Sequence, residues 1–258
     1  MDAIVTAGGV PQPGEPLYEY TRGEYKALLD VAGKPMVQWV LDALDEAKNV
    51  EKVVLVGLPE DRGIKSKKLA AILPNQGDML ENIRSGVTRL LELSPQAHHT
   101  LVVSSDIPAI TGEMIDWIVD VTMQTDEDIY YNVIEQDVME KRFPSSKRSY
   151  THLKDITVCG GDLNVIRTKT VVNNEKIWSK IIAARKNVFK QAALVGYDTL
   201  ILLLFRAITL EQTVNTATKR LDVTGRAIIC PYAEIGMDID KPNQLEIIRA
   251  DLEKRRIQ

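Results

Sequence analysis

The first 36 residues constrain the fold most, because a short apolar run is followed at once by glycines and a long polar loop. The run is Ala3-Ile4-Val5, the glycines lie in Ala7-Gly8-Gly9, and the loop ends near Lys26. This order predicts a buried strand, a tight turn and a loop that carries one lysine. Glycine lets a backbone approach a phosphate closely, successive amide groups can bind an anion, and a lysine ammonium adds positive charge. The alternative is an ordinary turn at the exit of a strand.

Two other phosphate-binding motifs are absent from this stretch. Gly9 and Gly14 have the glycine spacing of a P-loop, but Glu15-Pro16 follows where that motif requires a lysine and a hydroxyl residue. A dinucleotide fingerprint needs spaced glycines that open a helix, and prolines beginning at Pro11 occupy that region instead. The sequence therefore excludes both of these phosphate sites.

Short β-branched runs alternate with amphipathic segments along the rest of the chain. The segments with helical spacing are 36–48, 78–93, 111–125, 176–204 and 243–255, and a capping-box pattern at 209–212 opens another helix. The segments with strand composition are 52–57, 100–104, 128–134, 157–166 and 226–230, and 69–73 is a further short strand. This alternation predicts an α/β fold, with a mostly parallel, doubly wound sheet between two layers of helices.

Aspartates stand at two places where strands are expected to end. Asp106 follows the strand 100–104 after one residue, and Asp238 and Asp240 precede the last helix. Open α/β sheets bind ligands at the carboxyl ends of their strands, which makes Asp106 a candidate site residue. Alternation along an extended segment places Asp238 and Asp240 on one side. The alternatives are a turn aspartate before Pro108 and, for Asp240, a helix N-cap.

Composition excludes several classes of protein. The 258 residues are 45% hydrophobic and carry a net charge of −4, which indicates a sizeable core and argues against a nucleic-acid-binding protein. Cys159 and Cys230 form neither a disulfide framework nor a zinc-ligand pattern, as in a reducing cytoplasm. The apolar run Leu200–Phe205 is far shorter than the ~20 residues of a membrane helix, and no secretory leader is recognisable. We therefore expect a cytoplasmic protein without a transmembrane segment.

Three motifs of the N-terminal stretch occur together: Ala7-Gly8-Gly9, Lys26-Ala27-Leu28-Leu29 and Gly33-Lys34-Pro35-Met36. This arrangement resembles the nucleotidyltransferase superfamily, which includes molybdenum-cofactor guanylyltransferase-like (MobA-like) proteins, sugar-phosphate nucleotidyltransferases and cytidylyltransferases. The resemblance implies that the glycine turn wraps a nucleoside triphosphate and that Lys26 contacts its phosphates. The superfamily's usual Gly-x-Gly-x-Arg is absent, so Arg22, the only arginine of the loop, is the candidate for the catalytic arginine.

The resemblance also implies a nucleotide-diphospho-sugar transferase-like fold and further site residues. The expected domain is 1–258, with a nucleotide-binding half (1–125) and an acceptor-binding half (126–258) that ends in a helical lobe. Nucleotide contacts are implied for Gly77, Ser85, Gly86 and Asp106, and acceptor contacts for Gly160, Gly161 and Asp162. The alternative for Ser85-Gly86 is a helix packed closely on the sheet. The polar link 135–150, which contains Lys141, Arg142, Lys147 and Arg148, is either a solvated loop or a site for the acceptor's phosphate.

The expected function is Mg²⁺-dependent transfer of a nucleotidyl group from a nucleoside triphosphate to a phosphorylated small-molecule acceptor, with release of pyrophosphate. The resemblance implies that Asp106 and either Asp238 or Asp240 hold the Mg²⁺, a hard ion that prefers carboxylate oxygens. One alternative is a metal-dependent glycosyltransferase of the nucleotide-sugar fold, and the other is a catalytically inactive nucleotide-binding regulator. The backbone contacts of a glycine turn carry no code for the base, so the expectation covers all four nucleotides.

Overall fold

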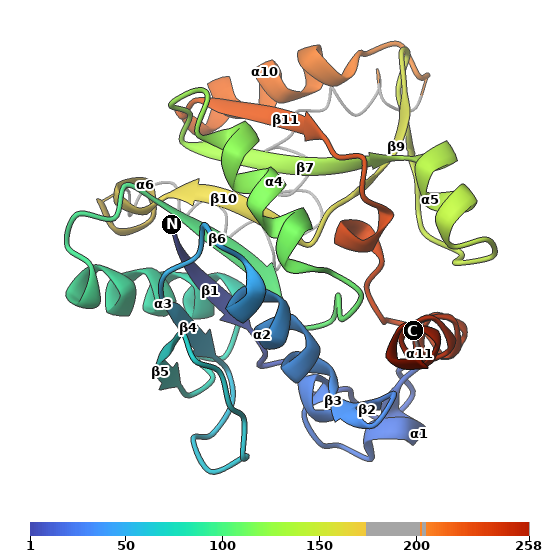
Figure 1. Ribbon diagram of the computed structural model, residues 1–258. Helices are drawn as coiled ribbons and strands as arrows, with labels where there is room; N and C mark the ends of the chain where they lie inside the picture. The colour runs from blue at the N-terminus through green and yellow to red at the C-terminus, as the bar shows by residue number, and fades with distance from the viewer. Residues whose placement is uncertain (174–201, 203–204, 258) are drawn as a thin grey trace.

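The computed structural model describes residues 1–173, 202 and 205–257. Its elements alternate between strand and helix over most of this length (Figure 1). The strands are β1 (Asp2–Thr6), β2 (Asp30–Val31), β3 (Lys34–Pro35), β4 (Val53–Val56), β5 (Leu69–Leu73), β6 (His99–Ser104), β7 (Ile129–Glu135), β8 (Thr151–His152), β9 (Thr157–Gly160), β10 (Leu163–Arg167) and β11 (Gly225–Ile229). The helices are α1 (Tyr18–Thr21), α2 (Met36–Glu46), α3 (Met79–Leu93), α4 (Gly112–Thr122), α5 (Gln136–Arg142), α6 (Thr168–Asn173), α10 (Leu210–Leu221) and α11 (Pro242–Ile257), with single turns η1 (Lys26–Leu28) and η2 (Ala233–Gly236).

The central sheet has the order β5-β4-β1-β6-β10-β7-β9-β8, and β11 pairs with the other edge of β7. Strands β5, β4, β1 and β6 are parallel to one another, as the run of buried strands predicts, and β11 is parallel to β7. β10 runs antiparallel between β6 and β7. The first half of the chain thus supplies the parallel part of the sheet, and the antiparallel strand β10 connects it to the strands of the second half.

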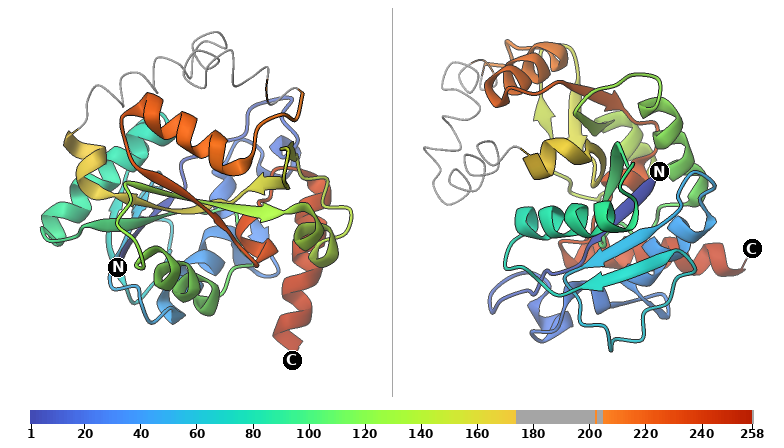
Figure 2. Two further views of the ribbon diagram at one scale, coloured as in Figure 1. Left: turned by 90° about the horizontal axis from the view of Figure 1, so that it is seen from above. Right: turned by 90° about the vertical axis from the view of Figure 1, so that its left-hand side faces the viewer.

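Helices cover both faces of this sheet, which confirms the predicted α/β class (Figure 2). α2 and α4 lie on one face, whereas α3, α6 and α10 lie on the other (Figure 2). β1 shows why two layers are needed: the side chains of Ala3 and Val5 join the core under α2 and α4, and that of Ile4 joins the core under α3. None of the described helices combines the length and the apolar character that crossing a membrane requires.

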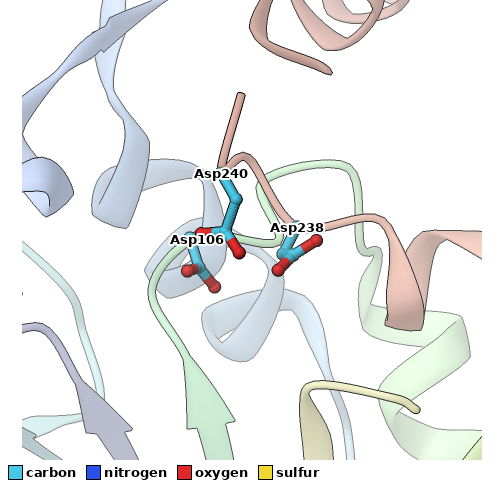
Figure 3. Close-up of side chains that lie close together, drawn as sticks. All are labelled: Asp106, Asp238 and Asp240. Carbon is cyan, nitrogen blue, oxygen red and sulfur yellow. The ribbon is translucent and has the colours of Figure 1, made fainter. Parts of the chain in front are cut away.

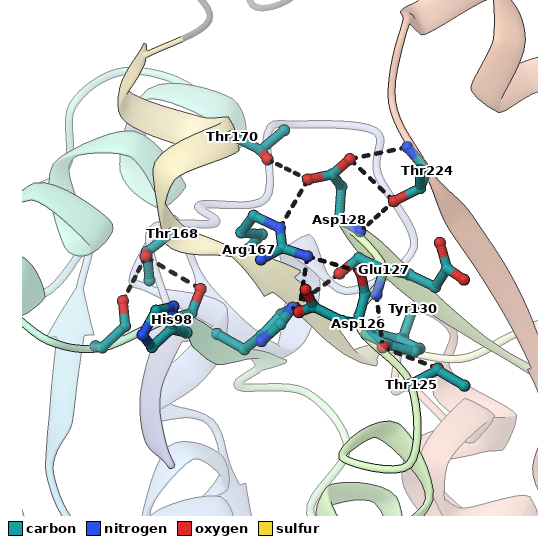
Figure 4. Close-up of polar contacts among 12 residues, drawn as sticks. His98, Thr125, Asp126, Glu127, Asp128, Tyr130, Arg167, Thr168, Thr170 and Thr224 are labelled. Atoms are coloured by element: carbon teal, nitrogen blue, oxygen red, sulfur yellow. Dashed lines mark hydrogen bonds and ion pairs between the residues drawn. The ribbon is translucent and has the colours of Figure 1, made fainter.

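A polar network fixes the strands of the second half to one another. The carboxylate of Asp128, just before β7, accepts hydrogen bonds from Arg167 at the end of β10, from Thr170 on α6 and from Thr224 before β11 (Figure 4). These contacts lie at the end of β7 opposite to the glycine turn, so they stabilise the sheet without entering the candidate site described below.

Three expectations for the second half have different outcomes. The capping box at Thr209 and Gln212 is present and opens α10. The link 135–150 is not simply a solvated loop, because residues 136–142 form helix α5 and Arg148 is largely buried. The predicted helical region 176–204 falls almost entirely outside the described residues.

Candidate functional site

The glycine turn and the end of β6 border a common cavity of about 280 Å³. Gly8, Gly9, Lys26, Gly77 and Asp106 all line it, so the structure brings together five of the residues that the sequence singled out. Its remaining wall comes from the start of α3 and the two strand ends, including Asn75, Asp78, Met79, Asn82, Thr6, Ser104 and Ser105. Ala7 itself is buried below the turn, where its N–H donates to the carbonyl of Val56.

Two contacts that the sequence did not reveal hold the glycine turn in place. Gly57, at the end of β4, has φ +114°, and a Cβ added there would lie 2.2 Å from the amide nitrogen of Gly8. On the other side, Asn75 Nδ2 donates to the carbonyl of Gly8 (3.1 Å), and Asn82 Nδ2 donates to Asn75 Oδ1 (3.1 Å). Asn82 is a buried polar residue on an otherwise apolar side of α3, and that exception to the helical pattern is the signal that could have identified it.

Lys26 is held where the loop returns to the turn. Its N–H donates to the carbonyl of Gly9 (2.8 Å), and the next residue, Ala27, is buried. Its ammonium lies between two carboxylates, with Nζ 2.7 Å from Asp106 Oδ2 and 2.5 Å from Asp240 Oδ1. Burial alone would lower the pKa of Lys26, but the charges of both aspartates and their hydrogen bonds outweigh it, so the pKa lies above its ordinary 10.5.

Three acids meet beside this lysine. Asp106, Asp238 and Asp240 each place a carboxylate oxygen within 4.8 Å of the others, and Figure 3 shows them converging from two segments of the chain. The segments are bound to one another, because the N–H of Ile239 donates to the carbonyl of Asp106 (3.0 Å). The carboxylate of Asp240 accepts a hydrogen bond from Lys26, and α11 begins at Pro242, so Lys241 and not Asp240 occupies the N-cap position. The N-cap alternative for Asp240 is therefore not what the structure shows.

Asp238 and Asp162 share a largely buried arginine. Arg148 makes an ion pair with Asp238, and its guanidinium lies 3.7 Å from Asp162. Burial, reinforced by the charges of Asp106 and Asp240 and opposed by Arg148 and Lys26, raises the pKa of Asp162 to about 7. Arg148 thus comes from the 135–150 link into the site, next to the expected acceptor residue Asp162.

The two glycines before Asp162 shape the backbone. A Cβ on Gly160 would lie 2.3 Å from the hydroxyl of Tyr131, and one on Gly161 would lie 3.0 Å from Asn132. β9 pairs with β7 in the sheet, and the missing Cβ atoms leave room there for Tyr131 and Asn132. Packing thus accounts for glycine at both positions, their contact with an acceptor stays a prediction, and Asp162 is the residue of this trio whose carboxyl group lies close enough to feel the charges of Asp106 and Asp240.

The expected site residues Gly86, Ser85 and Arg22 do not line the cavity. Gly86 packs on the sheet, because a Cβ there would lie 2.7 Å from Ile4 Cγ2, and Ser85 lies on the outer side of α3 with Arg84. The close-packing alternative for Ser85-Gly86 is therefore correct for Gly86. Arg22 is exposed, ends α1 with φ 51°, and does not line the cavity.

The chemistry of the acids fits a divalent cation. Oxygen ligands from carboxylates are those that Mg²⁺ prefers, and it commonly binds through one or two of them. Among the described residues, Asp106 Oδ1 is buried without a hydrogen-bond partner, a costly arrangement unless a ligand or cation completes it. Each of these acids is paired with a cation in the structure, Asp238 with Arg148 and both Asp106 and Asp240 with Lys26, so a divalent ion would replace or join those partners.

Comparison with solved structures identifies the fold. A hypothetical transferase from Thermus thermophilus is 31% identical, with a TM-score of 0.81, over 95% of this chain and 98% of that one. A CMP:2-keto-3-deoxy-manno-octonic acid synthetase complexed with CTP is 13% identical, with a TM-score of 0.58, over 98% and 99% of the two chains. A 2-C-methyl-D-erythritol 4-phosphate cytidylyltransferase, also from Thermus thermophilus, is 14% identical, with a TM-score of 0.53, over 98% and 100%. At such low identity, the last two show a shared fold.

Comparison by sequence identifies the family. No curated protein matches the chain significantly. The family model of the MobA-like NTP transferase domain, however, matches residues 3–199, which include the glycine turn, Lys26, Asp106 and Asp162. This match extends over more than half of the chain and agrees with the similarity to the hypothetical transferase. The chain therefore belongs to the family of the MobA-like NTP transferase domain.

Proposed function

We propose that this protein is a Mg²⁺-dependent nucleotidyltransferase that joins a nucleoside triphosphate to a phosphorylated acceptor and releases pyrophosphate. The observation that carries the proposal is the position of Lys26, whose ammonium lies between Asp106 and Asp240 at the rim of the glycine-turn cavity. A site that binds a triphosphate and neutralises its charge requires positive charge, carboxylates and exposed backbone, and all three lie here at the ends of strands.

The nucleotide side of the site is the cavity between the turn and α3. A Cβ added to Gly9 would meet nothing within 4 Å, so the backbone there is open to a phosphate group. Lys26 supplies a cation that can leave its aspartates for the triphosphate. When bound at Asp106 and Asp240, Mg²⁺ would neutralise further charge on the phosphates.

The acceptor side is the region of Asp162 and Arg148. Among the described residues, Arg148 Nε is buried without a hydrogen-bond partner, so this guanidinium retains a donor for an anionic group of the acceptor. In the reaction, an oxygen of the acceptor's phosphate forms a bond to the α-phosphorus, and the bond to the departing pyrophosphate breaks with its electron pair. A phosphate nucleophile is already ionised at neutral pH, so the site needs no general base.

Membership of this family argues against one of the two alternative functions, the glycosyltransferase. A glycosyltransferase would use a nucleotide-sugar, whereas the matching family is one of NTP transferases. An inactive regulator would bind the triphosphate without turning it over. We therefore regard pyrophosphate release as the deciding measurement, because it distinguishes the proposed enzyme from both alternatives.

The test starts with a thermal-shift panel of CTP, GTP, ATP and UTP with Mg²⁺. CTP has priority because one structural relative was solved with CTP and another is named a cytidylyltransferase. A nucleotide at one hundred times its Kd stabilises by about 2.7 kcal/mol, a rise of roughly 5–10 °C for a chain of this size. The nucleotide that binds is then assayed for pyrophosphate release with sugar phosphates and alditol phosphates. Binding without pyrophosphate release across the acceptor panel would favour the regulator.

Gly9 and Gly8 provide a matched pair for the nucleotide-binding step. Gly9→Ala places a methyl group in open space, so it should leave the melting temperature unchanged and weaken nucleotide binding by about tenfold or more. Gly8→Ala would clash with Asn75 and should lower the melting temperature itself. A Gly9→Ala variant with wild-type nucleotide affinity would show that no phosphate approaches this turn.

A further inference from the structure

The C-terminal helix α11 contacts both segments that carry the charged residues of the site. Figure 1 shows it beside the β2–β3 hairpin, which follows Lys26 directly in the chain. Three of its arginines donate hydrogen bonds to backbone carbonyls of other segments: Arg249, Arg255 and Arg256. Because these hydrogen bonds go to the backbone, they hold a segment in position independently of that segment's own side chains.

Two of these arginines hold the segment of Lys26. Arg249 donates through Nε (3.2 Å) and a terminal nitrogen (2.6 Å) to the carbonyl of Asp30. Arg256 donates to the carbonyl of Ala32 (2.6 Å) and lies against Gly33. Asp30 and Ala32 follow η1, the single turn that begins with Lys26, by two and four residues.

The same helix also contacts the two segments that carry Asp240 and Asp106, through Gln244 near its start and through Arg255. Gln244 Oε1 accepts from the amides of Asp240 (2.9 Å) and Lys241 (2.8 Å), which fixes the backbone of Asp240. Arg255 donates to the carbonyl of Ala109 (2.8 Å), in the loop that follows Asp106. One helix thus contacts three segments that are far apart in sequence and whose side chains meet at Lys26 Nζ.

We propose that α11 acts as a clasp in which Arg249 and Arg256 are positioning residues: they hold the segment of Lys26 at the distance from Asp106 and Asp240 that the reaction requires. This inference rests on the proposed function of Lys26. An error of about 1 Å in the placement of a reacting group can reduce a rate 10²-fold, so contacts that set the position of the Lys26 segment can affect catalysis.

The arginines are separable from the packing of the helix. Leu245, Ile248 and Leu252 form the buried face of α11 and supply its share of the core. Arg249 and Arg256 are seven residues apart and therefore share one flank of the helix, next to that face. Replacing them removes the contacts to residues 30–32 and leaves the buried leucines in place.

The experiment compares the double variant Arg249→Ala/Arg256→Ala with Lys254→Ala. Lys254 lies on the same helix, is exposed, and makes no hydrogen bond or ion pair with any described residue. The first readout needs no activity: amide hydrogen exchange of residues 25–36, measured by mass spectrometry. It should accelerate about tenfold or more in the double variant and remain at the wild-type rate in Lys254→Ala. Unchanged exchange in the double variant would overturn the proposal.

The second readout is kinetic and separates positioning from general destabilisation. The double variant should lower kcat for pyrophosphate release about tenfold with little change in KM for the nucleotide, because Lys26 is expected to act most strongly in the transition state. In a Lys26→Met background the same double change should cause no further loss, since residues that act through one group are not additive. A full additional loss in that background would overturn the positioning role.

A conservative variant covers the case in which the alanine variant folds poorly. Arg249→Lys/Arg256→Lys keeps both charges but offers fewer donors, and should reduce kcat by about threefold. If the wild-type protein releases no pyrophosphate from any nucleotide, the proposed function fails, and the exchange rates of residues 25–36 alone decide whether the clasp exists.

Discussion

Replacing Lys26 by methionine tests the centre of the site, because it removes a charge and keeps most of the side chain's apolar stem. Lys26 and Asp106 are both about one-sixth exposed, whereas Asp240 is 57% exposed. The contact with Asp106 is therefore worth about 2 kcal/mol, and that with Asp240 under about 1 kcal/mol. With about 2 kcal/mol lost, we expect the melting temperature in the absence of ligand to fall by roughly 4–8 °C.

The same variant should show a distinct response to Mg²⁺. In the wild-type protein the ammonium occupies the space between Asp106 and Asp240, so a cation without nucleotide must compete with it. In Lys26→Met the two carboxylates lack that counter-charge, and Mg²⁺ alone should restore several degrees of the lost melting temperature. Differential scanning fluorimetry with MgCl₂ and with EDTA measures both effects. Pyrophosphate release should fall about 10²-fold in kcat, on the scale of removing one preorganised charge.

Lys34→Met is the control. Lys34 pairs with Asp42 (2.6 Å) and lies over the ring of Trp39, away from the acids. Its loss should neither create a response to Mg²⁺ nor lower kcat by more than a few fold. If Lys26→Met matches Lys34→Met in melting temperature, Mg²⁺ response and kcat, the interpretation of the site is wrong.

Three other predictions follow from the site. Asp106→Asn and Asp240→Asn should each reduce turnover by at least 10²-fold, while each variant still shows the melting transition of a folded protein. Wild-type turnover that survives excess EDTA would contradict the proposed requirement for Mg²⁺. The pKa of Asp162 is about 7 in the folded chain, against its ordinary 3.8, so the folded state binds more protons than the unfolded state between these two pH values. The free energy of unfolding therefore falls as pH rises through 7. In EDTA, Asp162→Asn should therefore be more stable than wild type at pH 8 by about 1–2 kcal/mol, a figure that allows for the one-third exposed side chain of Asp162. Near pH 4 the two proteins should be equally stable. An equal gain in stability at both pH values would refute the raised pKa of Asp162. Limited proteolysis should cut between Val10 and Glu24, where residues 12–16 are exposed, and nucleotide with Mg²⁺ should slow it; equal cutting would argue against a phosphate-binding loop.

Local patterns predicted the parallel half of the fold well. Runs such as Val53–Val56 are buried on both faces, so their composition alone identifies them as central strands. Asp106 was identifiable for the same reason, because an acid directly after a buried strand must lie at the ligand-binding edge of the sheet. The predictions succeeded where a residue's position depends on the element next to it in the sequence.

Contacts between distant segments could not be predicted in this way. The antiparallel course of β10 depends on pairing with β6 and β7, and no local periodicity encodes that choice. Arg148 stood in a polar stretch that resembled a solvated loop, and its burial follows from Asp238, which lies 90 residues later. Ser85 and Gly86 were assigned to the nucleotide by the family resemblance, whereas the packing of α3 on Ile4 decides where Gly86 lies.

The interlocked backbones of Gly57 and Gly8 limit how this enzyme can be changed by directed evolution. A side chain at either position would enter space that is already occupied, by the backbone of the turn for Gly57 and by Asn75 for Gly8. No compensating substitution is available at Gly57, because the space there is filled by main chain that no substitution removes, whereas at Gly8 the obstacle is a side chain that a second substitution can shorten. Variation in substrate scope must instead come from side chains that border the cavity, such as Met79, which is half exposed, and Ser105.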